Sequence, residues 1–479
     1  MLPLAIALAT VGVATGCGSS STPAPATMSF HSRPDLQPPV VHVLQESAQA
    51  GKGLIFIAPK MGAPQYGAEI VDGAGQPVWF HPGVEVTDFR VQTYRGKPVL
   101  TWWQGPSSAP ILGTGFGSYV IMDSSYREIA HVQAGFGRDS GDLHEFQLTP
   151  KGTALLTAYR IVHGDLSSIG GPTDARVADS MFQEVDVATG KVLFTWHSIG
   201  HVGFAESYDP VPAKDAPPSA PVWDYFHINS VELEPNGNYL ISARNTWAVY
   251  EIDGKTGKVL WRLGGKKTSF EMGKGTRFAW QHDARFHPDG TLTIFDDEST
   301  PPEAPASRAI RLRLDAKAHT ATLVHADFVP GVLAPSQGNA QQLPNGDLFV
   351  GWGAVPRYTE FDAKGRIVYD ATFSAGDDSY RDYRFPWVGK PTTRPAIAVA
   401  DDGTVYASWN GATQVARWRV VAGPSAESLH EVGGGPKTGF ETTLTVTTIE
   451  PYVAVQALDA RGNVLGQSAA VRRGGLALG

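Results

Sequence analysis

The stretch Val231-Glu-Leu-Glu-Pro-Asn-Gly-Asn-Tyr-Leu-Ile241 contains two short runs of strand-forming residues separated by Pro-Asn-Gly. An Asn-Gly pair supplies the positive φ that a tight hairpin needs, so the stretch predicts two antiparallel strands. The pattern recurs at intervals of mostly about 55 residues, a length typical of one unit of a repeat protein. The other copies are Phe146–Leu156, Arg285–Ile294, Gln342–Val350 and Ala400–Ala407.

A second hairpin pattern, in which an Asp-containing turn joins two strands, accompanies most copies. Two hairpins per repeat give four antiparallel strands, which is the make-up of a propeller blade. The count of copies predicts an all-β fold with a six-bladed β-propeller over residues 49–421, although seven blades are possible. An insertion at His197–Val222 explains the longest interval. The second pattern occurs at Ile70–Trp79, Glu184–Phe194, Glu251–Trp261 and Glu360–Val368.

Residues 422–479 follow a different pattern. Their short alternating strands predict a C-terminal β segment, either a small β-sandwich-like module or strands that complete the first blade. The abundance of turns supports the all-β prediction, because the 479 residues include 53 glycines and 35 prolines.

The N-terminus has the character of an export signal. Residues 2–16 are apolar and end in small residues before Cys17, the only cysteine. The pattern predicts a signal peptide over residues 1–17, lipidation of Cys17 and a flexible tether over residues 18–48. We therefore expect an exported lipoprotein anchored to the outer face of the cell membrane; a secreted protein with an ordinary signal peptide is the alternative.

Charge and cysteine content narrow the classes of partner. The formal net charge of -8 argues against nucleic acid as a main partner. A single cysteine excludes an intrachain disulfide and a cysteine-based metal site. No run after residue 17 reaches the ~20 apolar residues of a membrane span.

Unusual polar residues precede the first strand of several repeats, the strand that lines the channel of a propeller. Aligned on the turn proline, His144, Asn229 and His282 lie six residues before it, and His227 and Trp280 lie eight before it. Both positions fall on the same strand face, because side chains alternate along a strand. We therefore expect three histidines at one mouth of the channel, where they suit proton transfer, nucleophilic attack or metal binding.

Arginines and aromatic residues complete the candidate site. Arg308 and Arg244 are candidates for pairing with an anionic substrate, since a guanidinium matches oxyanions. Trp280 and Tyr225 flank the histidines and either form a slot for a ring or pack between blades. Further candidates for substrate binding are Gln281 and Asn339.

At four motifs the chain resembles the arylsulfotransferase family, in the branch common in actinobacteria and fungi. The resemblance covers about residues 50–420. Its most specific parts are the Phe-His-x-Asn-Ser and Trp-Gln-His-Asp-Ala sequences. The motifs are Asp142-Leu-His-Glu-Phe146, Asp224-Tyr-Phe-His-Ile-Asn-Ser-Val231, Phe278-Ala-Trp-Gln-His-Asp-Ala-Arg-Phe286 and the Asn339–Gly353 segment with its Gly-Trp-Gly end.

The resemblance implies a six-bladed propeller that moves a sulfuryl group from an aryl sulfate ester to a phenol. It implies no nucleotide sulfate donor, no cofactor and no metal, and a sulfated histidine as intermediate. His227 and His282 match two channel histidines of the family, and Arg308 matches its arginine.

One departure from the family pattern leaves alternatives open. A later blade, where the better-known bacterial branch has its sulfated histidine, carries Ser336-Gln-Gly-Asn339 instead. Either His282 or His227 is then the nucleophile, or transfer is direct, or this branch does other chemistry. The main alternative is a non-catalytic propeller lipoprotein that binds a ligand or protein at the cell surface. A quinoprotein-like propeller and a hydrolase with a histidine-bound metal rank below it.

Overall fold

The computed structural model describes residues 27–60, 64–107, 110–138, 140–374 and 376–479. Cys17 and the predicted signal peptide lie outside these residues. The described residues form strands and three short 3-10 helices, η1 (Ser167–Ile169), η2 (Phe204–Glu206) and η3 (Arg244–Thr246), so the all-β prediction is confirmed. None of the helices in the described ranges is long and apolar enough to cross a membrane.

Residues 42–385 form six sheets of four or five strands. Each sheet follows chain order through consecutive antiparallel hairpins, with an extra strand at one edge of three of them. The first comprises β26 (Tyr383–Phe385), β2 (Leu54–Ile57), β3 (Gly67–Val71) and β4 (Pro77–Pro82). The second comprises β5 (Val86–Tyr94), β6 (Lys97–Gln104), β7 (Ser118–Met122) and β8 (Glu128–Val132), and the third β9 (Phe146–Leu148), β10 (Thr153–Gly164), β11 (Ala175–Asp186) and β12 (Val192–His197).

The other three sheets continue the same order. They comprise β13 (Ile228–Leu233), β14 (Tyr239–Ala243), β15 (Ala248–Ile252) and β16 (Val259–Gly264); then β18 (His282–Phe286), β19 (Thr291–Asp296), β20 (Arg308–Asp315), β21 (Thr320–Asp327) and β17 (Glu271–Met272); and β22 (Asn339–Gln342), β23 (Leu348–Gly351), β24 (Arg357–Phe361), β25 (Ile367–Thr372) and β1 (His42–Glu46).

The quoted Asn-Gly turn closes the β13–β14 hairpin. Gly237 has φ 88, and its N–H donates to the carbonyl of Glu234. This is the left-handed conformation that glycine adopts without a steric penalty.

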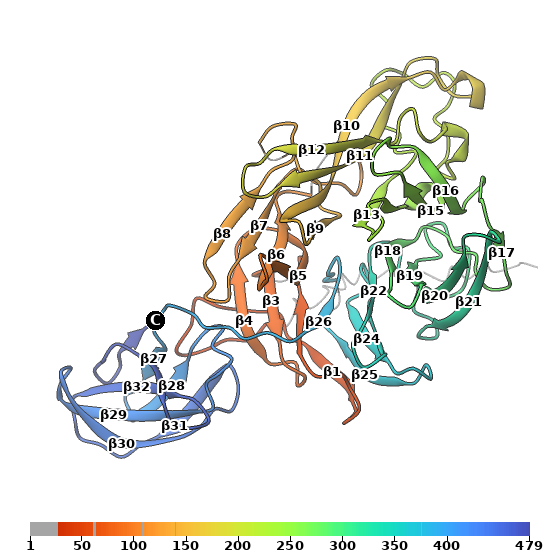
Figure 1. Ribbon diagram of the computed structural model, residues 1–479. Coiled ribbons are helices and arrows are strands. Elements are labelled where there is room, and N and C mark those ends of the chain that lie inside the picture. Colours follow the sequence, from red (N-terminus) through yellow and green to blue (C-terminus); the bar gives the residue numbers. More distant parts are fainter. Residues whose placement is uncertain (1–26, 61–63, 108–109, 139, 375) are drawn as a thin grey trace, which may run out of the picture.

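The six sheets contact one another in a closed cycle. Contacts run from β5 to β9, from β10 to β13, and from β13 through β18 to β22; β23 contacts β26, which contacts β5. Strand β26, from the far end of this region, pairs with β2 as the first strand of the first sheet. The sheets are therefore arranged radially, in the manner of propeller blades (Figure 1).

A cluster of six charged side chains joins the inner strands of these sheets. Arg381 Nη1 lies 3.0 Å from Asp88 Oδ1, and Arg90 Nη2 lies 3.1 Å from Asp88 Oδ2. Glu145 contacts Arg90 and Arg381. The remaining members, Asp283 and Arg285, form an ion pair 2.7 Å long, and Arg285 also bonds Glu145. Three cations thus balance three carboxylates inside the molecule. We call these six residues the buried charge cluster.

The C-terminal module is a sandwich of two sheets, lying beside the first and second sheets (Figure 1). One sheet comprises β27 (Ala396–Val399), β28 (Thr404–Ser408), β31 (Glu441–Thr445) and β34 (Leu476–Ala477), and the other β29 (Arg417–Ser425), β30 (Ser428–Pro436), β32 (Tyr452–Leu458) and β33 (Val464–Gln467).

The border of this module differs from the predicted one at residue 422. The Ala400–Ala407 copy of the repeat forms β27 and β28, which pair within the module. Ile397 and Val405 share one apolar core with Trp418 and Val455, so the module includes the chain from Ala396 onward. The reason is that a generic strand–turn–strand pattern fits a sandwich as well as a blade.

The predicted flexible tether over residues 18–48 is corrected for residues 27–48. The N–H and the hydroxyl of Ser32 both donate to Glu441 Oε2 at 2.6 Å, and Phe30 and Leu36 pack against Phe440. Strand β1 pairs with β25. Apolar side chains that a tether would expose are thus buried against two parts of the fold.

We predict that Arg381→Met strongly destabilises the protein. The substitution leaves Asp88 and Glu145 buried with one cation too few, which costs about 3 to 5 kcal/mol for a broken buried ion pair. Urea unfolding followed by tryptophan fluorescence measures the loss. The control Arg366→Met removes an exposed partner of Asp362 and is expected to change stability by less than about 1 kcal/mol. Equal stability of the two variants would contradict the role of the cluster.

Candidate functional site

The three predicted histidines meet in one cavity of about 330 Å³. The rings of His144 and His227 lie edge to face, with centroids 4.8 Å apart. The rings of His282 and His144 both meet the Tyr380 ring edge to face, with centroid distances of 6.4 Å and 5.6 Å. The other lining residues are Lys60, Glu85, Ser107, Gly113, Leu143, Ser336, Gln337 and Asp378.

Local backbone irregularities turn the polar residues toward the centre. His227 has φ 56 and Asp283 has φ 53, a conformation uncommon for residues with a Cβ. The pairing of β18 with β19 shifts register between His282 and Arg285, and that of β13 with β14 shifts between Ile228 and Ser230. Such bulges re-aim side chains and are frequent near functional sites.

Each histidine is held by its own carboxylate through Nδ1. The Nδ1–Oδ2 distances are 2.6 Å for His144 with Asp142, 2.5 Å for His227 with Asp224 and 2.9 Å for His282 with Asp297. With an ionised carboxylate, the neutral imidazole donates its Nδ1 proton, which leaves the lone pair on Nε2. Three oriented imidazoles therefore carry an available nitrogen base each.

Burial keeps two of the imidazoles neutral. Desolvation lowers the pKa of His144, and desolvation together with the nearby Arg244 cation holds the pKa of His282 well below its ordinary value. Burial raises the pKa of Asp297, and Arg244 opposes that rise. The pKa of Asp142 is lowered despite the desolvation that opposes it, because His144 favours its charged form.

Arg244 is the predicted arginine that the structure brings close to the histidines. Its guanidinium stacks on the Trp280 ring, 4.7 Å from the centroid, and donates to the carbonyls of Ser299 and Pro335. The side chain forms no ion pair within 4 Å among the described residues. Trp280 is thus a platform for Arg244.

Arg308 lies elsewhere. Its Nε lies 2.9 Å from Asp296 Oδ2, and its Nη2 lies 3.3 Å from Glu298. It also donates to the carbonyl oxygens of Gly275 and Arg277. The guanidinium is therefore satisfied by the protein. Neither Arg308 nor Arg244 is among the residues that line the histidine cavity, but the charge of Arg244 acts on His282.

The predicted amides join neighbouring sheets. Asn229 Nδ2 donates to the carbonyl of Gln281, and Asn339 exchanges two hydrogen bonds with the backbone of Asp382. Gln281 Nε2 donates to backbone carbonyls at residues 243 and 248. Tyr225 is buried in an apolar core. The structure gives these four residues packing and positioning contacts and does not place them in the lining of the cavity.

Sequence reasoning missed the carboxylates and two lining residues. Asp142 and Asp224 stand in the quoted motifs, two and three residues before their histidines, so the signal was present. Asp297 lies beyond the Phe278–Phe286 motif, and nothing in the sequence pairs it with His282. Lys60 and Tyr380 lie outside the repeats, and their place depends on closure of the ring.

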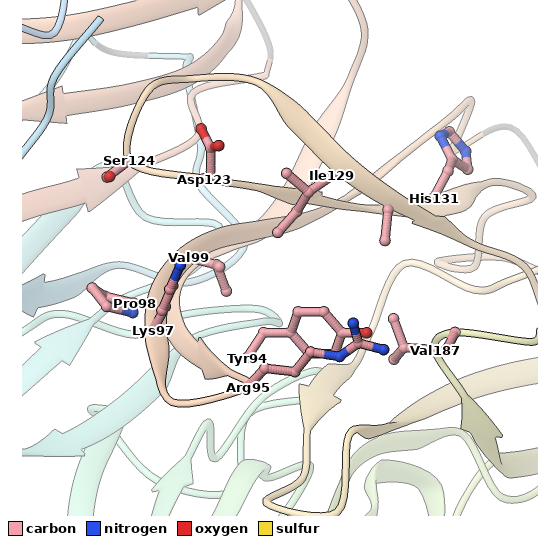
Figure 2. Close-up of a pocket in the computed structure, with 12 residues that line it drawn as sticks. Tyr94, Arg95, Lys97, Pro98, Val99, Asp123, Ser124, Ile129, His131 and Val187 are labelled. Carbon is pink, nitrogen blue, oxygen red and sulfur yellow. The ribbon is translucent and has the colours of Figure 1, made fainter.

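A larger cavity of about 750 Å³ lies away from the histidines (Figure 2). Arg95 stacks on the Tyr94 ring there, and His131 is bonded to Glu128 and Ser118. Arg95 and His131 thus have local partners, and size alone does not identify the site. In the described part of the chain, no group of three or more His, Cys, Asp or Glu residues is arranged to hold a metal ion.

Solved structures with a distant likeness include several bacterial proteins. A protein of unknown function from Bacteroides caccae has a TM-score of 0.41 at 15% identity, over 69% of this chain and 98% of that one. A putative 6-phosphogluconolactonase from Bacteroides fragilis has a TM-score of 0.36 at 13% identity, over 71% and 99%. A streptogramin B lyase has a TM-score of 0.35 at 11% identity, over 77% and 94%.

No curated protein matches the chain in sequence. A family model does: the one described as Arylsulfotransferase (ASST) matches residues 90–374, more than half of the chain. The matched range contains all three histidines, their carboxylates and Arg244. The chain therefore belongs to the arylsulfotransferase (ASST) family.

Proposed function

We propose that the six sheets are the blades of one six-bladed propeller, and that its histidine cavity transfers a sulfuryl group from an aryl sulfate ester to a phenol. Membership of the family supports the class of reaction and of substrate. The observation that carries the assignment to this cavity is the set of three carboxylate-held histidines beside an arginine. This arrangement provides both a nucleophile and a proton carrier.

His282 is the proposed nucleophile. It is the most buried of the three, at 1% exposure, and its neutral form leaves the Nε2 lone pair free when Asp297 is ionised. Arg244, whose charge acts on both His282 and Asp297, is positioned to neutralise sulfuryl oxygens. When ionised, Asp297 stabilises the cationic ring that forms when the imidazole is sulfated.

The transfer is balanced in two steps. Nε2 of His282 forms a bond to sulfur as the ester S–O bond breaks, and the leaving phenolate takes the Nε2 proton of whichever of His144 and His227 enters this step as the imidazolium. The acceptor phenol then gives its proton to that histidine and attacks sulfur, and the N–S bond breaks. The close contact of the His144 and His227 rings supports a shared proton between them.

The site also bears on the missing family histidine. The segment Ser336-Gln-Gly-Asn339 contributes Ser336 and Gln337 to the cavity, both of which are weak nucleophiles without a base beside them. His282 therefore takes the covalent role in this proposal, and His227 shares proton transfer with His144.

We further propose export and anchoring through a lipid on Cys17, with secretion as the alternative. The apolar stretch over residues 2–16 and the Ser- and Pro-rich segment after Cys17 support it. In this proposal the chain between the lipid on Cys17 and the folded part is short, because the chain packs against the fold from Phe30 onward.

The histidine variants are expected to separate the roles. With p-nitrophenyl sulfate as donor and phenol as acceptor, His282→Ala should show no transfer. The variant should also take up no covalent label from the ³⁵S-labelled ester. His144→Ala and His227→Ala should slow transfer by about 10²- to 10⁴-fold, the usual contribution of general acid–base catalysis, and still take up label. His287→Ala, outside the cavity, is the control. Label retained in His282→Ala would contradict its covalent role.

The pH dependence of transfer tests the electrostatics around His282. Protonation removes the nucleophile, so kcat/KM should fall with decreasing pH only below about 6.5, the ordinary value for histidine. Arg244→Gln removes a cation that lowers the pKa of His282, so the acidic limb should move to higher pH. Arg244→Lys should leave it nearly in place. A limb that is identical in Arg244→Gln and wild type would exclude this coupling.

Lipidation is tested separately. In the native host, Cys17→Ser should abolish incorporation of radiolabelled palmitate and move the protein from the membrane fraction to the medium. Palmitate incorporation that persists in the variant would disprove anchoring at Cys17.

A further inference from the structure

Two residues from outside the family motifs line the histidine cavity. Lys60 follows β2, and Tyr380 precedes β26, so both belong to the sheet in which the two ends of the ring meet. The proposed nucleophile, His282, accounts for one part of the cavity wall. These two residues supply further hydrogen-bond donors beside the three histidines.

Lys60 is held in place by polar partners. Its Nζ donates to Gln337 Oε1 at 3.0 Å and lies 3.4 Å from Asp378 Oδ2, while Gln337 Nε2 donates to the same Asp378 oxygen. The side chain of Lys60 is only 9% exposed, so the ammonium group is fixed at the cavity wall. Gln337 has φ 71 and belongs to the Ser336-Gln-Gly-Asn339 segment, which stands in the later blade where the family pattern has a histidine.

Tyr380 lines the same cavity and carries an unpaired hydroxyl. The residue is 1% exposed, and among the described residues its hydroxyl has no hydrogen-bond partner. Its ring contacts His144 and His282 edge to face and lies under the Lys60 ammonium, 6.0 Å from the ring centroid. A buried hydroxyl without a partner costs free energy, and an oxygen of a molecule bound in the cavity would offset this cost by accepting its hydrogen bond.

We propose that the Tyr380 hydroxyl and the Lys60 ammonium bind the sulfuryl oxygens of the sulfate ester while a histidine attacks the sulfur. Tyr380 donates one hydrogen bond, and Lys60 supplies charge that Gln337 and Asp378 hold in position. No bond to Tyr380 or Lys60 forms or breaks. Donors fixed before the reaction stabilise charge on these oxygens without reorganising. The inference rests on the proposed sulfuryl transfer and names the residues that hold the transferred group.

Steady-state transfer from p-nitrophenyl sulfate to phenol tests both residues. Tyr380→Phe removes only the hydroxyl and should lower kcat by on the order of 100-fold with a smaller change in KM, as for a lost oxyanion donor. Lys60→Met should lower kcat/KM by at least about 10-fold, and Lys60→Arg should restore part of it. Tyr369→Phe is the matched control, because it removes a buried tyrosine hydroxyl of β25 outside the cavity.

The outcomes separate this inference from the proposed reaction. Tyr380→Phe with the activity of Tyr369→Phe, at equal melting temperature, would overturn it. If wild type transfers nothing, sulfuryl transfer is rejected, and calorimetric binding of p-nitrophenyl sulfate then decides the inference. Binding weakened about 10-fold or more by Lys60→Met would support the oxygen-binding role. Equal affinity of Lys60→Met and wild type, or no binding to wild type, would reject it.

Discussion

The buried charge cluster is the interaction on which the rest of the molecule depends. A single arginine or carboxylate taken out of water costs several kcal/mol, and only close partners offset this. Asp88, Glu145 and Arg381 come from three different sheets and meet within hydrogen-bond distance. The ion pairs that offset this cost form only when the three sheets are correctly positioned. The arrangement of the sheets and the balance of buried charge therefore depend on each other.

The cluster also reaches the site through Arg381. This residue directly follows Tyr380 and lies under its ring, with the guanidinium carbon 5.0 Å from the ring centroid. Its charge contributes to the lowered pKa of His144 and of His282. Nη2 donates to the carbonyl of Asn229, in the strand that follows His227. The same side chain thus positions the cavity and favours neutral imidazoles in it.

Neutral imidazoles suit the chemistry of the arylsulfotransferase family. A cationic ring has no lone pair to attack sulfur, whereas a neutral ring held through Nδ1 presents Nε2. The three carboxylates hold the rings in defined orientations, and Arg244 supplies positive charge without the counter-ion that occupies Arg308. The carboxylates therefore orient the imidazole rings, and a separate residue, Arg244, supplies the positive charge.

The sequence by itself determined the repeat, the all-β class and the meeting of the three histidines. These follow from local rules, since turn residues fix hairpins and strand alternation fixes the face on which a side chain lies. Local rules did not locate the border near Ala396, because the Ala400–Ala407 hairpin fits either sheet arrangement. Local rules also assigned residues 27–48 to a tether, because this segment has no regular pattern of apolar residues. In the structure Phe30 and Leu36 are nevertheless buried.

Only the tertiary structure decided which distant side chains share the cavity. Lys60 and Tyr380 meet because β26 returns across the whole ring to pair with β2, a contact that no repeat spacing encodes. Arg244 rather than Arg308 acts on the histidines for a similar reason. Both arginines follow an inner hairpin, but Asp296 and Glu298 form ion pairs with Arg308. Pairing at long range depends on ring closure and on side-chain direction, and these are properties of the folded chain.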